Sequence, residues 1–162
     1  MLELMRSIDG TALGHTMLAS RWLFALMEVL HFVGLALLSA GIAAFDLRVL
    51  GVAPRLPIAS VHRFVLLSLA GFAFTALSGV LFFVADPVRY GTNPIFMVKM
   101  ALIALAGINA LRFERLWTGR WRHLPVGAVL PPAAKLLCAG SLLLWTAVIV
   151  TGRVLPQFSR TF

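Results

Sequence analysis

Four long apolar stretches dominate this chain and constrain its fold more than any other feature. They cover residues 22–45, 63–85, 94–111 and 133–154, and each is close to the roughly 20 residues that an α-helix needs to cross a bilayer. The chain is 60% hydrophobic and 12% charged, whereas soluble domains carry about 25% charged residues. So few charges cannot cover a soluble domain of this length. The sequence therefore predicts an all-α membrane protein, a four-transmembrane-helix bundle formed by residues 22–155.

Charged residues and prolines mark the ends of these stretches. Trp22 begins the first stretch, and Asp46 follows it as a charged stop. Pro87 closes the second stretch, because proline cannot continue a helix. Pro94 begins the third and Pro132 precedes the fourth, each at a place that suits the first helical turn. These signals set the predicted boundaries.

The two ends of the chain are expected to lie outside the bundle. Residues 1–21 have an irregular amphipathic pattern interrupted by glycines, which fits a short helix on the membrane surface and fits a frayed terminus equally well. We include the surface helix in the predicted fold and expect residues 156–162 to form a tail. A cleaved signal peptide is disfavoured, because the first apolar run is too long for one and contains Glu28 and His31.

The basic residues beside the stretches predict the orientation. The first and third connections and their flanks carry eight of them, against five on the other side. The eight are Arg48, Arg55, Arg63, Arg112, Arg115, Arg120, Arg122 and Lys135, and the five are Arg6, Arg21, Arg89, Arg153 and Arg160. This bias places both termini on the non-cytoplasmic side of a bacterial inner membrane.

The net charge of +8 is therefore interpreted as a topology signal, with the lipid bilayer as the partner and no nucleic acid. The chain has one cysteine, Cys138, and no Cys-x-x-Cys-His motif, so covalent haem attachment is excluded. It also lacks the nucleotide-binding and zinc-protease motifs of soluble enzymes. The sequence therefore offers no motif for the catalysis that such soluble enzymes perform.

Small residues predict where helices approach one another closely. Within the second stretch they recur every four residues, and pairs occur in the other stretches: Gly71, Thr75 and Gly79, then Gly34 with Gly41 and Ala106 with Ala110. Small side chains let backbones come together in lipid. The pattern fits packing within the chain, a homo-oligomer or a larger membrane complex equally well.

Three ionisable residues lie well inside the stretches, away from their ends, and such residues mark functional sites by default. At a rise of about 1.5 Å per residue, Glu28 lies ~9 Å and His31 ~14 Å below the start of the first stretch. Lys99 lies ~8 Å below the start of the third. All three fall in the outer half of the membrane, where they form one cluster if the first and third helices are neighbours.

Two interpretations of this cluster remain open. In the first, Lys99 pairs with Glu28 and the network only fixes helix register. In the second, His31 is the metal ligand of a haem b, and Lys99 pairs with a propionate or steers an acidic substrate. Met97 and Met100, near Lys99, are candidates for a second axial ligand or for packing.

Three further polar residues are of interest. His62 begins the second stretch from the cytoplasmic side, ~15 Å from His31 along the membrane normal, so the two are too far apart to share an iron. Asn109 is expected to bond across to another helix. Trp145 lies in the middle of the fourth stretch, so its indole N–H needs a buried acceptor or the edge of a cofactor.

The stretch from Glu28 to Gly34, with Gly41, Phe45–Arg48, Asn93–Lys99 and Asn109, resembles an uncharacterised family of small bacterial four-helix membrane proteins. The likeness covers residues 22–153 and brings no assigned activity.

A first-stretch histidine followed ten residues later by glycine, with a third-stretch lysine, is also loosely similar to HemJ-type protoporphyrinogen oxidases and CopD-like copper-resistance membrane proteins. The HemJ likeness implies haem b at His31 with Lys99 as its essential partner. This chain lacks the histidine that the HemJ type has at the cytoplasmic end of its first span.

Three functions follow as hypotheses. The first is a membrane-embedded redox protein on the quinone side that binds a b-type haem through His31, with Lys99 and Glu28 as its polar shell. The second is a non-catalytic accessory subunit of a larger membrane complex. The third is a permease for a small solute or a metal.

The predicted orientation can be tested by cysteine labelling. A cysteine introduced at Arg89 is expected to react with a membrane-impermeant thiol reagent added from outside, and one introduced at Arg120 is not. The reverse labelling pattern would overturn the orientation and the depths assigned to Glu28, His31 and Lys99.

Overall fold

A computed structural model of the chain describes residues 14, 16, 19–117, 125 and 127–158. Its helices in these ranges are α3 (Arg21–Leu50), α4 (Ile58–Ala85), α5 (Pro87–Gly91), α6 (Pro94–Trp117) and α7 (Pro132–Phe158). All except the short α5 are long and apolar enough to cross a membrane, and the described part contains no strand. The predicted all-α bundle of four membrane-spanning helices is confirmed, and the chain is a multi-pass membrane protein. The predicted surface helix lies mostly outside the described residues.

The helices are longer than the apolar stretches that predict them. α3 has 30 residues and α4 has 28, and at about 1.5 Å per residue each exceeds the ~30 Å hydrocarbon core. α3 continues through its charged stop until Gly51, which ends it with a left-handed φ of 103°. Its N–H bonds back to the carbonyl oxygens of Leu47 and Arg48 at 3.1 and 3.2 Å. Glycine suits this position because the left-handed region penalises a Cβ atom.

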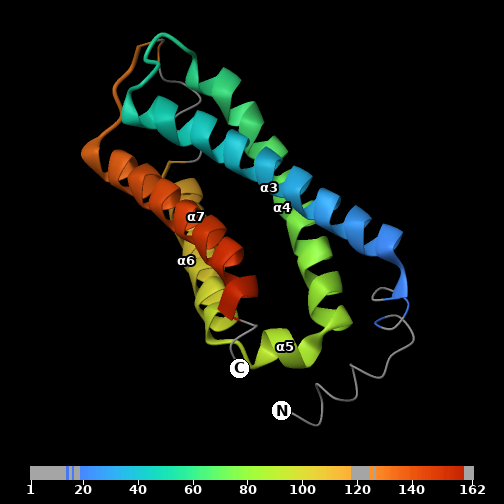
Figure 1. The fold of residues 1–162 in the computed structure, drawn as a ribbon. Helices are drawn as coiled ribbons and strands as arrows, with labels where there is room; N and C mark the ends of the chain where they lie inside the picture. Colours follow the sequence, from blue (N-terminus) through green and yellow to red (C-terminus); the bar gives the residue numbers. More distant parts are fainter. Residues whose placement is uncertain (1–13, 15, 17–18, 118–124, 126, 159–162) are drawn as a thin grey trace.

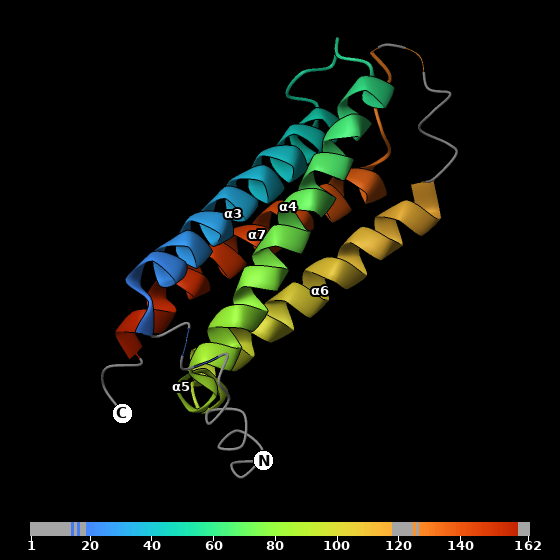
Figure 2. The same ribbon diagram turned by 90° about the vertical axis from the view of Figure 1, so that its right-hand side faces the viewer.

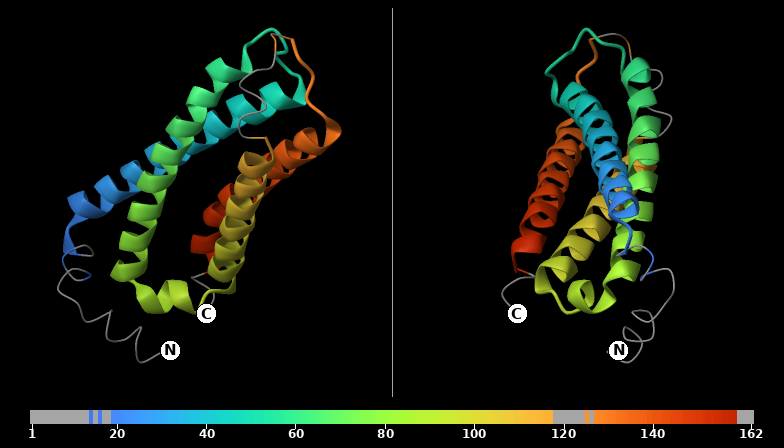
Figure 3. Two further views of the ribbon diagram at one scale, coloured as in Figure 1. Left: turned by 180° about the vertical axis from the view of Figure 1, so that it is seen from behind. Right: turned by 45° about the vertical axis from the view of Figure 1, so that its right-hand side comes forward.

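The helices form two antiparallel pairs (Figure 1). α3 packs most extensively on α4, α6 packs on α7, and α3 also packs on α7. α5 crosses from α4 to α6 at the end where α6 begins, as Figures 2 and 3 show from other sides. At the opposite end, all four long helices contribute to one hydrophobic core, made of Phe45, Val49, Ile58, Val61, Phe113, Leu130, Ala134 and Cys138.

α3 and α4 meet along a regular seam. The α3 residues on this seam alternate between spacings of four and three: Met27, His31, Gly34, Leu38, Gly41, Phe45 and Arg48. Their partners run backwards along α4, from Ala85 beside Met27, through Ser78 beside His31, to His62 beside Phe45. A repeat that averages 3.5 residues is the spacing that keeps two helices in contact over many turns.

The two backbones come closest where glycines meet. A Cβ atom at Gly34 would lie 2.6 Å from Oγ1 of Thr75 and 2.8 Å from the carbonyl oxygen of Gly71. A Cβ atom at Gly71 would collide with the backbone nitrogen of Leu38. Gly71 and Thr75 therefore pack within the chain, whereas a Cβ atom at Gly79 would have no neighbour within 4 Å among the described residues.

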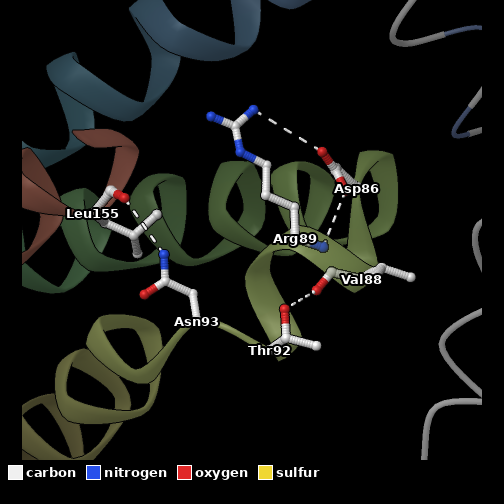
Figure 4. A network of polar contacts seen from close by, with 6 residues as sticks. All are labelled: Asp86, Val88, Arg89, Thr92, Asn93 and Leu155. Atoms are coloured by element: carbon white, nitrogen blue, oxygen red, sulfur yellow. Dashed lines mark hydrogen bonds and ion pairs between the residues drawn. The ribbon is translucent and has the colours of Figure 1, made fainter. Parts of the chain in front are cut away.

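Side-chain amides join α6 to α7. Asn109 donates from Nδ2 to the carbonyl oxygen of Leu137 at 2.9 Å, which confirms the predicted bond to another helix. Asn93, just before α6, donates to the carbonyl oxygen of Leu155 at 3.4 Å (Figure 4). Inside a bilayer a side-chain amide has no water to bond to, so a hydrogen bond to another helix satisfies it instead. The two bonds lie near opposite ends of the α6–α7 pair.

The glycine contacts predict different outcomes for two identical substitutions on α4. Gly71→Ala is expected to destabilise the protein by about 1–3 kcal/mol, because the methyl group meets the α3 backbone. Gly79→Ala is expected to be neutral or stabilising by up to about 1 kcal/mol, since alanine favours the helix and meets nothing. Unfolding in detergent micelles with increasing dodecyl sulfate, followed by circular dichroism, measures both. Equal effects would contradict the close approach at Gly71.

Candidate functional site

His31 lies half-buried on the α3–α4 seam, where two α4 side chains hold its ring. Its Nδ1 lies 2.9 Å from Oγ of Ser78, which is completely buried. The ring of Phe82 meets the imidazole edge to face, with ring centroids 5.7 Å apart and an angle of 71° between the planes. These contacts fix the position and the orientation of the imidazole.

The hydrogen bonds of Ser78 favour one imidazole tautomer. Its hydroxyl donates to the carbonyl oxygen of Phe74 at 2.7 Å and also lies 3.1 Å from the carbonyl oxygen of Thr75. A hydroxyl has only one proton to donate, so when Ser78 gives it to a backbone carbonyl oxygen, it accepts from His31 and Nδ1 carries the hydrogen. In the neutral ring, Nε2 then keeps its lone pair and can bind a metal or accept a proton.

Lys99 approaches this region from α6. Its Nζ would lie 3.4 Å from a Cβ atom at Gly152, so the glycine leaves room for the lysine against α7. Its charge acts electrostatically on His31 across the space between the helix pairs. The structure thus brings Lys99 and His31 into electrostatic range, although α3 and α6 are not extensively packed neighbours.

Glu28 does not join Lys99. Its side chain is exposed on α3, and neither residue takes part in an ion pair in the described part of the chain. The ion pair of the α5 region is Arg89 with Asp86, 4.0 Å apart (Figure 4). A Lys99–Glu28 ion pair that fixes helix register is therefore absent from this structure.

The remaining candidate residues lie on α6 and α7. The ring of Trp145 on α7 meets that of Phe72 on α4, with centroids 6.2 Å apart, so it links the two helix pairs. The side chains of Met97 and Met100 on α6 are exposed. Their role as axial ligands stays a prediction.

His62 lies at the other end of α4, which confirms its separation from His31. Its ring packs against Phe45 with centroids 6.0 Å apart. It precedes Ser78, the partner of His31, by 16 residues on the same helix, a rise of ~24 Å. The described residues also include no cluster of three or more His, Cys, Asp or Glu side chains placed to hold a metal ion.

A second polar region lies where α3 meets α7, at residues that the sequence did not predict to form a site. Asp46 is 5% exposed and Arg48 is 3% exposed. Asp46 faces Cys138 and Ser141 of α7. The spacing of three between Cys138 and Ser141 places both on one helix face, and this was the available signal.

Comparison of the chain with known protein families, curated proteins and solved structures finds no match.

The pKa of Tyr90, the one tyrosine of the chain, depends on where the Glu28 carboxylate lies. Burial raises the pKa of Tyr90, Arg89 lowers it, and the charges of Asp86 and Glu28 raise it further. Tyrosinate absorbance is therefore expected only above pH about 10, the ordinary value. Glu28→Gln should lower the titration midpoint, because it removes a negative charge that opposes the phenolate.

The matched control is Arg89→Gln, which removes a positive charge and should raise the midpoint of Tyr90. Ultraviolet absorbance during a pH titration in detergent measures all three proteins. A midpoint that Glu28→Gln leaves unchanged would place the carboxylate away from α5.

Proposed function

We propose that this membrane protein is a redox protein that binds a b-type haem through Nε2 of His31. One observation carries the proposal: the hydrogen-bond chain from Nδ1 of His31 to Ser78 and on to the carbonyl oxygen of Phe74. Metal-bound histidines commonly donate their second ring N–H to a fixed acceptor, which sets the tautomer and raises the basicity of the ligand. His31 has this arrangement inside a membrane-spanning helix.

The neighbouring residues suit the chemistry of a haem. Lys99 has no ion-pair partner among the described residues, and it lies in electrostatic range of His31. A propionate would supply the missing negative charge. Phe82 lies against the imidazole and gives the ring an apolar neighbour. His31 would thus bind the iron, Ser78 would orient His31, and Lys99 would neutralise a propionate.

A bound haem b supplies one-electron transfer, with a potential set by its ligands and surroundings. We place the site in the outer half of a bacterial inner membrane, with both chain termini outside, on the basis of the basic residues beside the helices. A quinol or quinone in the bilayer is the redox partner that suits this depth. His62 is too far along α4 to serve as the second ligand.

The proposal predicts a Soret band for the detergent-purified protein after expression with sufficient haem. His31→Ala is expected to abolish the band, because it removes the axial nitrogen. His62→Ala is the matched control and should retain it. A wild-type protein without a Soret band, or a band that survives in His31→Ala, would contradict the proposal.

Variants of Ser78 test whether haem binding depends on the orientation of His31 as well as on its presence. Ser78→Ala leaves Nδ1 of His31 without its acceptor and is expected to weaken haem binding by about 10–100-fold. Ser78→Thr keeps the hydroxyl and should restore binding. A haem titration followed by absorbance measures the dissociation constants.

A second candidate function is an accessory subunit of a larger membrane complex. The observation in its favour is the open space at Gly79 and Gly107, where a partner helix can approach the backbone. Stoichiometric copurification with a larger membrane protein, without a Soret band, would support this role.

A further inference from the structure

The junction between the two helix pairs contains a buried carboxyl group. Asp46 of α3 is 5% exposed and faces α7, where the Ser141 hydroxyl and the Cys138 thiol donate toward it. Its Oδ2 is buried and has no hydrogen-bond partner. Both α7 donors therefore serve the other oxygen, and Oδ2 has no partner among the described residues.

Among the described residues, no cationic side chain forms an ion pair with this carboxyl group. Arg48, two residues further along α3, donates from Nε to the carbonyl oxygen of Leu56 at 2.6 Å. Lys135 lies one turn before Cys138 on α7. Within the described ranges, neither forms an ion pair with Asp46. An ionised Asp46 would thus be a buried charge without a partner, which is among the most unfavourable states in a protein interior.

The other helices bring rings close to Phe45, the residue that precedes Asp46 on α3. α4 contributes His62, which packs against Phe45, and α6 contributes the ring of Phe113, 5.4 Å from that of Phe45. The titratable group of α7 that faces Asp46 is the Cys138 thiol, and a thiolate there would add a second negative charge.

We propose that Asp46 is a proton-binding site buried between α3 and α7. The proton occupies Oδ2 and removes the charge, while Ser141 and Cys138 donate to the other oxygen. A proton fits better than a metal ion, because hard metal cations require six or more oxygen ligands and Asp46 offers one free oxygen beside a thiol. Buried carboxyl groups of this kind serve as proton-carrying sites in membrane proteins.

The site is independent of the proposed haem. Asp46 follows His31 by 15 residues on α3, a rise of ~22 Å. Its role also differs, because it joins the two helix pairs whereas His31 is held within one of them. Loss of the proton would place an unpaired charge in the α3–α7 contact and weaken the packing of one pair on the other.

Infrared spectroscopy of the full-length protein in lipid vesicles tests the proposal directly. A protonated carboxyl group has a carbonyl stretch at higher frequency than any carboxylate band. At pH ~5.5, where an ordinary aspartic acid with a pKa of about 3.9 is ionised, the wild-type protein is expected to show this band. The band should be missing in Asp46→Asn and should disappear from the wild type as the pH is raised.

Asp86→Asn is the matched control, because Asp86 lies partly exposed beside Arg89 and should not contribute to the band. Ser141→Ala keeps the carboxyl group and removes one donor, so the band should remain but shift in frequency. This variant also gives an answer if Asp46→Asn does not fold. A wild-type minus Asp46→Asn spectrum that contains only carboxylate bands at pH ~5.5, or a band that Ser141→Ala leaves unshifted, would overturn the proposal.

Discussion

The close approach of the α3 and α4 backbones at Gly34 and Gly71 determines much of the rest of the structure. Within a bilayer, apolar side chains gain little by leaving lipid for protein, so helices associate through close packing of small residues. A Cβ atom at either glycine would overlap the opposite helix. This contact sets the antiparallel register, and the register places Ser78 opposite His31. The imidazole orientation is thus a consequence of the glycine contact.

The membrane helices could be predicted from the sequence, because hydropathy and length decide whether a segment can cross the bilayer. The bond of Asn109 to α7 followed from the same physics, since a polar group in lipid must find a partner. The alternating spacing of four and three along α3 was also present in the sequence. It predicts the α3–α4 seam, whereas the small residues alone could not separate Gly71, which packs on α3, from Gly79, which is open.

The sequence predicts a depth for the candidate site but not the direction of its side chains. The helical rise sets how far a residue lies from the end of its span, and it predicts similar depths for Glu28, His31 and Lys99. Which way a side chain points depends on the neighbouring helices. His31 lies on the α3–α4 seam, whereas Glu28, three residues earlier, is exposed. The burial of Asp46 could not be predicted either, because α7 reaches α3 only in the folded bundle.

α3 carries both polar sites, but the two sites depend on different helix contacts. The bond between His31 and Ser78 lies within the α3–α4 pair, so it does not depend on the contacts between the two helix pairs. The distance from His31 to Lys99 spans both pairs, since Lys99 belongs to α6 and rests against Gly152 of α7. Asp46 lies in the α3–α7 contact between the same pairs. The Lys99–His31 interaction and the Asp46 contact thus both depend on how the two pairs pack together, whereas the orientation of the imidazole depends on α3 and α4 alone.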